Sequence, residues 1–277
     1  MNEPRQQADY THRQVEAARR VLTDIGQVLA AFNDAIVVVG GWVPDLLIQE
    51  PSTEHVGSID VDLALDAAKL GDGRYADLLK VLLDSRRYAT GDKSFQLVTN
   101  VDLGDGEAPV RVDVEFLAPD DVKLATNRPK LVADFRVLRF AACAAAFVDP
   151  QQVEFSGLTT SGARNTVRLR VASLSNFIVM KTYALNGRDK PKDVYDICYC
   201  LDEHPDGLNA VAADWKARRD DPLIAAAIDI LRQKFESVDH FGPRQLAIFY
   251  DAVTNEDKAT HGRRAFELIQ ALLRAVL

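Results

Sequence analysis

Cysteine and long apolar runs are scarce in this sequence of 277 residues. The three cysteines, Cys143, Cys198 and Cys200, are an odd set, and two residues that lie two positions apart on a helix point about 200° away from each other. We therefore expect neither a disulfide nor a zinc site. The longest apolar run, residues 140–148, is far shorter than the roughly 20 residues that span a bilayer. The first residues also lack the apolar core of a signal peptide, so we expect a cytoplasmic protein.

Basic residues are fewer than acidic residues overall, and they are unevenly distributed along the chain. The net charge is −8, and residues 1–122 carry −11, residues 123–192 carry +8 and residues 193–277 carry −5. An acidic chain does not favour indiscriminate binding to nucleic acid, whereas a local excess of Lys and Arg suits a polyphosphate ligand or an RNA. The alternative is that the basic stretch is an ordinary solvent-exposed surface that binds no ligand.

Hydrophobic periodicity predicts an α+β fold with a mixed β-sheet core, followed by helices. The front part contains helices over 13–32, 44–48 and 75–83, and strands over 35–39, 58–65, 95–103, 110–116, 152–156 and 166–171. The back part contains helices over 174–186, 191–201, 208–218, 222–236, 244–253 and 262–276. We expect two domains, residues 1–171 and a helical domain over residues 172–277.

Carboxylates gather on one face of two predicted strands. Alternation in 58–65 places Ser58, Asp60 and Asp62 together opposite an apolar face, and alternation in 110–116 does the same for Asp113 and Glu115. Carboxylates at positions i and i+2 of a strand project side by side and suit Mg²⁺, which prefers carboxylate and phosphate oxygens. If the two strands are neighbours, Asp113 completes a site for two metal ions.

A glycine pair, Gly40 and Gly41, stands between the strand at 35–39 and the helix at 44–48. Glycines at such a bend let backbone N–H groups approach a phosphate. Alone, a glycine pair is usually only a turn, and an Asp-x-Asp pair is usually only a solvent face. Together they indicate a site for a nucleoside triphosphate (NTP) and Mg²⁺ or Mn²⁺.

The order of strand, Gly-Gly, helix, Asp-x-Asp strand and second acidic strand resembles the nucleotidyltransferase superfamily of the DNA polymerase β type. The gap from the glycines to Asp60 is slightly longer than the common spacing. The segment from residue 174 to residue 197 also resembles the closing motif of AbiEii-type nucleotidyltransferases, which include the MenT-like toxins. The resemblance implies that residues 1–171 are the catalytic domain. It also implies that the helical domain contributes to the nucleotide pocket through a helix lysine and a basic and acidic segment, here Lys181, Arg188, Lys192, Asp193 and Asp196.

The sequence leaves alternative roles for several further residues. Ser58 shares a face with Asp60 and is a candidate partner for a triphosphate oxygen, or else a strand-edge hydroxyl. The arginines in the strand at 166–171 and just before it are candidates for binding the leaving pyrophosphate or the acceptor's phosphates, or are scattered surface residues: Arg164, Arg168 and Arg170. His55 is expected at the surface.

The leading hypothesis is transfer of a nucleoside monophosphate from an NTP to a hydroxyl, with release of pyrophosphate. Asp60 and Asp62 then bind the metal, Asp113 is a third ligand or the base, and Lys181 neutralises phosphate charge. The resemblance implies a toxin with the tRNA 3′ end as acceptor and a protein antitoxin as partner. Two rivals stay open: an antibiotic-modifying nucleotidyltransferase of the aminoglycoside type, and an inactive nucleotide-binding or antitoxin-binding module.

Overall fold

The computed structural model describes residues 3–71, 73–120 and 135–277. Part of the basic stretch, residues 123–134, lies outside the described residues. The chain forms two compact units. The sheet unit comprises Thr11–Leu46 and Gly57–Ser173, and the helical unit comprises Met1–Tyr10, Leu47–Val56 and Leu174–Leu277. The expected domain boundary at residue 172 stays a prediction.

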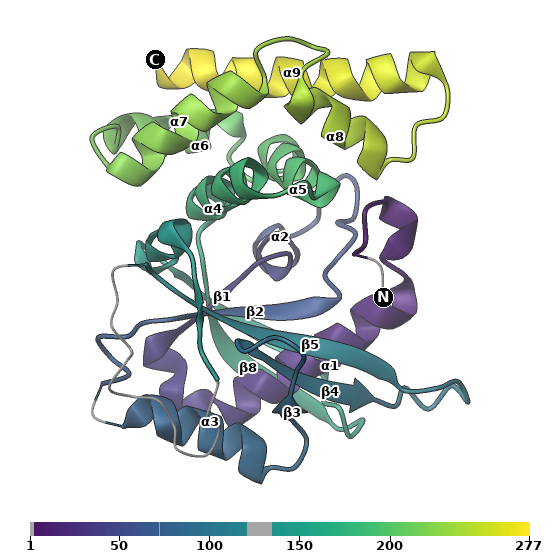
Figure 1. Ribbon diagram of the computed structural model, residues 1–277, viewed down its shortest axis with the longest axis vertical. Coiled ribbons are helices and arrows are strands. Elements are labelled where there is room, and N and C mark those ends of the chain that lie inside the picture. Colours follow the sequence, from purple (N-terminus) through teal and green to yellow (C-terminus); the bar gives the residue numbers. More distant parts are fainter. Residues whose placement is uncertain (1–2, 72, 121–134) are drawn as a thin grey trace. The chain divides into compact units, whose positions relative to one another are not determined.

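A mixed sheet of eight strands forms the sheet unit, which confirms the α+β class with a mixed sheet core (Figure 1). The strands run in the order β3-β4-β5-β2-β1-β8-β7, and β6 pairs with β5. Their bounds are β1 (Ile36–Val39), β2 (Asp60–Leu65), β3 (Ala89–Thr90), β4 (Gln96–Val101), β5 (Val110–Ala118), β6 (Leu138–Arg139), β7 (Gln151–Leu158) and β8 (Arg164–Val171). Each strand predicted from the sequence is present. Strands β3 and β6 were not predicted, because two residues are too short to show alternation.

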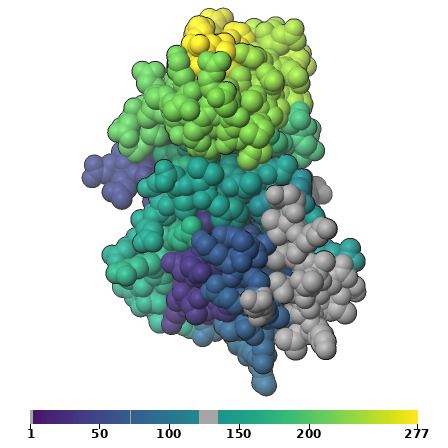
Figure 2. Space-filling view, turned by 90° about the vertical axis from the view of Figure 1, so that its left-hand side faces the viewer, coloured from purple at the N-terminus to yellow at the C-terminus, as the bar shows by residue number. Residues whose placement is uncertain are grey.

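Helix α1 (His12–Val28) covers one face of the sheet, where it packs on β5, β7 and β8. Thr11 caps its first turn by accepting from the backbone N–H of Gln14. The sequence predicted one helix to residue 32, but α1 ends at Val28 and a 3₁₀ helix, η2 (Ala30–Ala35), follows. Helix α3 (Arg74–Asp84) lies on the same side of the sheet as α1 (Figure 1), and Figure 2 shows the two next to each other at the surface.

The opposite face of the sheet carries the acidic residues. Strand β2 pairs in antiparallel fashion with β1 and in parallel with β5, and Asp60 lies beside Asp113 in the second pairing. The two acidic strands are therefore neighbours, which is the condition under which the sequence placed Asp113 next to Asp60. The short helix α2 (Trp42–Leu47) follows β1, and the 3₁₀ helix η4 (Ala141–Phe147) lies against β1 and β5.

The helical unit contains the 3₁₀ turn η1 (Gln7–Asp9) and six longer helices. These are α4 (Leu174–Gly187), α5 (Pro191–Asp202), α6 (Leu208–Ala217), α7 (Pro222–Lys234), α8 (Phe241–Phe249) and α9 (Asn255–Val276). Pro191 and Pro222 stand at helix starts, where the missing N–H of proline costs nothing. Helix α5 packs on α4 and α8, and α9 packs on α8 and α6, around a core that includes Phe177, Trp215 and Phe249.

The described residues bear on two expectations, one about the cysteines and one about membrane-spanning helices. The three cysteines are buried and free. None of the helices in residues 3–71, 73–120 and 135–277 combines the length and apolarity required to cross a bilayer.

Candidate active site

A glycine bend after β1 leaves room for a carboxylate on β2. Gly40 has a φ of +69°, in the left-handed region that residues with side chains rarely adopt. A methyl group placed on Gly40 would lie only 1.9 Å from Oδ2 of Asp62. Both the backbone and the neighbouring carboxylate therefore require glycine at position 40. A phosphate-binding role for Gly40 and Gly41 stays a prediction.

Strand β2 begins with the paired carboxylates. Asp60 and Asp62 are half-buried and lie on the same face of the strand. The Ser58 hydroxyl donates to Oδ1 of Asp60 at 2.6 Å, and the indole N–H of Trp42 donates to the backbone carbonyl of Asp60 at 2.7 Å. The start of β2 is thus held by a fully buried aromatic side chain from α2, and the Asp60 carboxylate is held by the residue two positions before the strand.

Asp113 lies beside Asp60 in the parallel pairing of β5 with β2, but its carboxylate has other partners. Arg111 donates to Oδ1 of Asp113 at 3.0 Å, and the Gln96 side chain donates to Oδ2 at 2.8 Å. Within the described residues, no group of three His, Cys, Asp or Glu side chains is arranged to hold a metal ion. The three-carboxylate cluster expected from the sequence is therefore not assembled in this structure.

The donor set nevertheless suits a divalent cation. Mg²⁺ is typically held by one or two protein carboxylates, and substrate phosphates and water supply the other oxygens. Asp60 and Asp62 provide two such carboxylates at neighbouring positions on one strand face. A third protein ligand is not required for this mode of binding, so the pair fits Mg²⁺ or Mn²⁺.

Two further polar residues on this face were not named as site residues from the sequence. Glu115 lies beside Asp62 in the pairing of β5 with β2, and Gln96 donates to Glu115 at 3.1 Å as well as to Asp113. Lys93 also forms an ion pair with Glu115 at 3.0 Å. The alternation of β5 was a sufficient signal for the side on which Glu115 projects. Gln96 gave no signal, because its role depends on how β4 pairs with β5.

The helical unit gathers the basic and acidic residues of its motif into one network, which is buried except for the exposed Arg188. Lys181 on α4 contacts Oδ2 of Asp196 at 2.7 Å and Oδ1 of Asp193 at 3.1 Å. Lys192 contacts Oδ1 of Asp196 at 2.7 Å, and Arg188 donates two hydrogen bonds of 2.8 Å to Asp193. Positions three and four apart share a helix face, which explains why α5 can present all its motif residues to Lys181.

Burial and pairing act against each other in this network. Burial opposes ionisation of both carboxylates, but Lys181 and its neighbouring cations hold the pKa of Asp193 below its ordinary value and that of Asp196 well below it. Burial likewise opposes the charge of Lys181, whose pKa is nevertheless raised by Asp196 and Asp193. The pKa of Lys192 is lowered by burial and by the nearby Lys181. Lys181, Arg188 and Lys192 thus surround Asp193 and Asp196.

His55 joins the same network, contrary to the surface position expected from the sequence. Its side chain is 1% exposed, and Nε2 lies 3.0 Å from Oδ1 of Asp196. Its ring stacks on Tyr195, with centroids 5.3 Å apart and an interplanar angle of 21°. The backbone N–H of Val56 donates to the Tyr195 hydroxyl, and the Tyr199 hydroxyl donates to the carbonyl of Thr53. The loop before β2 is therefore docked on α5 by contacts that no local pattern reveals.

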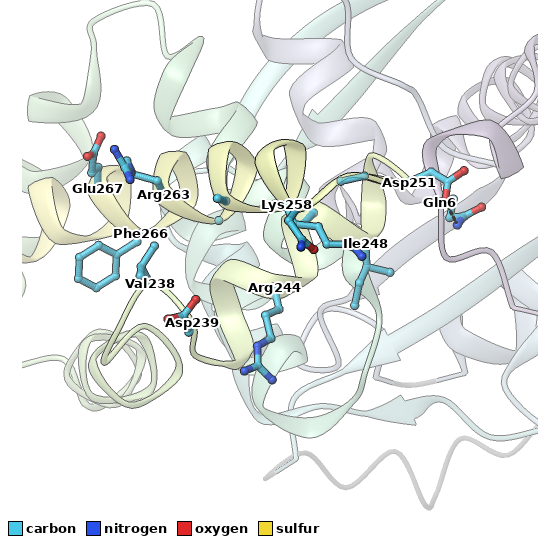
Figure 3. A pocket seen from close by; sticks show the side chains of 15 residues that line it. Gln6, Val238, Asp239, Arg244, Ile248, Asp251, Lys258, Arg263, Phe266 and Glu267 are labelled. Carbon is cyan, nitrogen blue, oxygen red and sulfur yellow. Dashed lines mark hydrogen bonds between the residues drawn. The ribbon is translucent and has the colours of Figure 1, made fainter.

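A groove of about 790 Å³ on the helical unit is separate from this network (Figure 3). It is lined by residues of α8 and α9, by the segments next to them and by Gln6. Val238 and Phe266 lie near each other at one end, and Arg244 lies near Asp239 in the middle (Figure 3). None of the residues predicted as site residues lines the groove, so we do not assign the chemistry to it.

Comparison with known proteins identifies a family that matches most of the chain. The family described as "Nucleotidyl transferase AbiEii toxin, Type IV TA system" matches residues 28–269. No curated protein matches the chain. Among solved structures, JHP933 from Helicobacter pylori is similar, with 12% identity, a TM-score of 0.45, and 96% of this chain and 94% of that chain covered. A second H. pylori protein, described as a candidate nucleotidyltransferase, has 10% identity, a TM-score of 0.43 and coverage of 98% and 94%.

The family match extends over most of the chain. It includes the bend at Gly40, the carboxylates of β2 and β5, and the buried network of α4 and α5. The resemblance inferred from the sequence is thereby confirmed. The chain belongs to the AbiEii nucleotidyltransferase toxin family of type IV toxin–antitoxin systems, and it is a transferase.

Proposed function

We propose that the protein transfers a nucleoside monophosphate from an NTP to a hydroxyl of an RNA acceptor and releases pyrophosphate. The observation that carries this proposal is the pair Asp60 and Asp62, which β2 holds on one face beside a glycine that has no room for a side chain. Two adjacent carboxylates suit a cation that also binds phosphate oxygens. Membership of an enzyme family supports a catalytic role over an inactive binding module.

Asp60 and Asp62 would hold Mg²⁺ or Mn²⁺ in this reaction. The bound cation supplies neutralisation of charge on the phosphate oxygens and activates the attacking hydroxyl. Ser58 keeps the Asp60 carboxylate oriented through the hydrogen bond at 2.6 Å. Asp113 either adds an oxygen ligand or receives the proton of the hydroxyl, and its carboxylate, which already accepts from Arg111 and Gln96, has further lone pairs for either role.

The reaction forms a bond between the acceptor oxygen and the α-phosphorus of the NTP. The bond from the α-phosphorus to the oxygen that bridges to the β-phosphorus breaks, and its electron pair leaves with the pyrophosphate. The hydroxyl proton passes to the base. The protein's part in such a transfer is mainly positioning and charge stabilisation. No nucleophilic serine or cysteine of the chain is needed.

Lys181, Arg188 and Lys192 are proposed to bind the triphosphate. Lys181 and Lys192 both contact Asp196, and Lys181 and Arg188 both contact Asp193, so the motif holds three cations close together, an arrangement that suits a polyphosphate. Charge in a buried environment acts more strongly than the same charge in water. Asp193 and Asp196 orient the cations, and contacts of these aspartates with the ribose or base are part of the same proposal.

The acceptor is proposed to be the 3′ end of tRNA, and growth arrest would follow from its modification. Membership of a toxin–antitoxin family and the basic excess in residues 123–192 support this assignment. An antitoxin protein is the expected partner, and the reaction belongs in the cytoplasm, where NTPs and tRNA occur. One observation favours a polycationic antibiotic as acceptor instead: the face of β2 and β5 carries Glu115 in addition to three aspartates.

An incorporation assay tests the proposal. Wild-type protein is incubated with each labelled NTP, Mg²⁺ and either total tRNA, cell protein or an aminoglycoside, and the labelled product is separated and identified. Label at the RNA 3′ end, abolished in Asp60→Asn, supports the proposal, and label on the drug supports the antibiotic alternative. Asp77→Asn on α3 is the matched control, because Asp77 is exposed and lies outside the candidate site. Equal label with wild type and Asp60→Asn would refute the assignment of Asp60.

A further inference from the structure

One face of the β7–β8 hairpin carries a row of arginines. Arg164, Arg168 and Arg170 occupy even positions of β8 and therefore project to the same side. The odd positions Val167 and Leu169 are buried, and α1 packs on that side. The arginines consequently lie on the side of the hairpin that α1 does not cover.

Strand register shows which face of the sheet this is. Val38 of β1 pairs with Val171 of β8, so the preceding residue of β8, Arg170, projects to the side opposite Val38. Val39 also projects opposite Val38, and it pairs with Asp62. The row of arginines and the candidate metal-binding carboxylates therefore lie on the same face of one sheet.

The charges in this row are available to a ligand. Arg164 is exposed, and in the part of the chain that the structure describes it has no ion pair. Arg168 pairs with Glu154, but their side chains are 78% and 66% exposed, and an ion pair so exposed adds little stability. Arg170 donates to the backbone carbonyl of Asp34, a neutral acceptor that leaves its charge uncompensated.

The length of the row distinguishes between two possible ligands. Six residues of β-strand separate Arg164 from Arg170, which corresponds to roughly 20 Å at about 3.3 Å per residue. A pyrophosphate is a compact ion that leaves from the metal-binding carboxylates. It cannot contact both ends of such a row. A polyanion with regularly repeated phosphates can do so.

We propose that the face of β8 with Arg164, Arg168 and Arg170 binds the phosphate backbone of the RNA acceptor. This inference rests on the proposed function, since it identifies the surface that guides the acceptor to the carboxylates. Alternate residues of a strand lie roughly 7 Å apart, a spacing similar to that of neighbouring phosphates in an extended nucleic acid. Ser156 and Thr166 share a hydrogen bond between their hydroxyls on the same face, where they are placed to donate to phosphate or 2′-hydroxyl oxygens.

Equilibrium binding tests this surface without any turnover. The probe is a fluorescently labelled RNA hairpin with a single-stranded 3′ end, measured by anisotropy at several salt concentrations in the absence of NTP. The variant Arg164→Gln/Arg168→Gln should weaken binding at least about tenfold. Loss of two phosphate contacts should also reduce the slope of log K against log salt by about 1.4 to 1.8.

Two controls separate this effect from misfolding and from general loss of charge. Arg164→Lys/Arg168→Lys keeps both charges and should retain most of the affinity. Arg219→Gln/Arg232→Gln removes two exposed arginines near and on α7 and should leave the affinity unchanged. A wild-type affinity and slope in the Arg164→Gln/Arg168→Gln variant would overturn the proposal. Failure of the wild type to bind the RNA would do the same.

A second pair of measurements separates this proposal from the proposed function. A DNA hairpin of the same sequence should lose affinity in the Arg164→Gln/Arg168→Gln variant as the RNA does, because phosphates are common to both. Weaker binding of DNA with unchanged binding of RNA would overturn the proposal. If wild type binds RNA through these arginines but transfers no nucleotide to it, the surface is supported and the RNA acceptor reaction is refuted.

Discussion

Gly40 offers a direct way to perturb the candidate active site without changing any charge. Alanine at this position meets two obstacles that the structure allows us to separate. The first is the backbone, since φ is +69°, and the second is the collision of a methyl group with Oδ2 of Asp62 at 1.9 Å. The collision can be relieved only if the Asp62 carboxylate moves or if the bend after β1 shifts.

The two obstacles have different magnitudes. A residue with a side chain costs roughly 1–2 kcal/mol in the left-handed region. A contact of 1.9 Å cannot persist, and the rearrangement that relieves it typically costs a further 1–3 kcal/mol, as for other overpacked sites. We therefore expect Gly40→Ala to lower the free energy of unfolding by about 2–5 kcal/mol. Because Asp62 is displaced, we also expect the transfer activity to fall by at least about 100-fold.

Gly104→Ala is the matched control for the backbone. Gly104 has a φ of +73°, and no atom lies within 4 Å of the position that its Cβ would occupy. Urea unfolding should give only the backbone cost for this variant, and nucleotide incorporation should remain at the wild-type level. In the Asp62→Ala background the carboxylate is gone and only the Cβ of residue 62 remains close, at 2.9 Å, so Gly40→Ala should cost less there than in the wild-type background. Equal stability losses for Gly40→Ala and Gly104→Ala in the wild-type background, with full activity in both, would refute the reasoning.

Three further predictions concern the other residues. Asp60→Asn should abolish incorporation while the urea midpoint changes little, because its half-buried carboxylate serves the reaction rather than the core; retained activity would contradict this. Lys181→Met should cost about 3–5 kcal/mol by leaving Asp193 and Asp196 undercompensated. Both carboxylates have pKa values below 3.8 in the folded protein, so their ionised forms stabilise the fold above that pH, and this contribution is lost as the pH falls. The free energy of unfolding, measured with urea from pH 6 to pH 3, should therefore depend less on pH in Lys181→Met than in the wild type. His55→Phe keeps a ring at the position but removes the hydrogen bond to Asp196, so the KM for NTP should rise more than kcat falls. His55→Gln should restore part of the loss. An unchanged KM in His55→Phe would exclude a positioning role.

Sequence patterns predicted the sheet and its acidic face because alternation in β2 and β5 is local. Once the apolar residues of a strand are buried, the side of Asp60 and of Asp113 is determined. The helices of the back half followed from periodicity for the same reason. The predicted helix ends were less accurate. The helix expected over 244–253 is α8 at Phe241–Phe249, and the helix expected over 262–276 begins earlier, at Asn255.

Contacts between distant segments could not be predicted in this way. His55 is buried because a loop docks on Tyr195 and Tyr199, which are some 140 residues further along the chain. The engagement of Asp113 with Gln96 depends on strand pairing, although Arg111, two residues earlier on the same strand face, could have been recognised from alternation. The glycine bend was recognised, but the collision that requires glycine there depends on Asp62 in the adjacent strand.

The aspartates of the two motifs lie in two environments, and the difference determines what each can bind. Asp193 and Asp196 are fully buried, Asp193 is contacted by Lys181 and Arg188, and Asp196 is contacted by Lys181, Lys192 and His55. A divalent cation could reach them only by displacing lysine and arginine charges that already offset the cost of burial, so these aspartates act as counter-ions to those cations. Asp60 and Asp62 are half-buried on a strand face, where water and phosphate oxygens can complete the coordination of a metal ion. Under the proposed function, aspartate supplies metal ligands on β2, whereas on α5 it supplies counter-ions, and burial accounts for the difference.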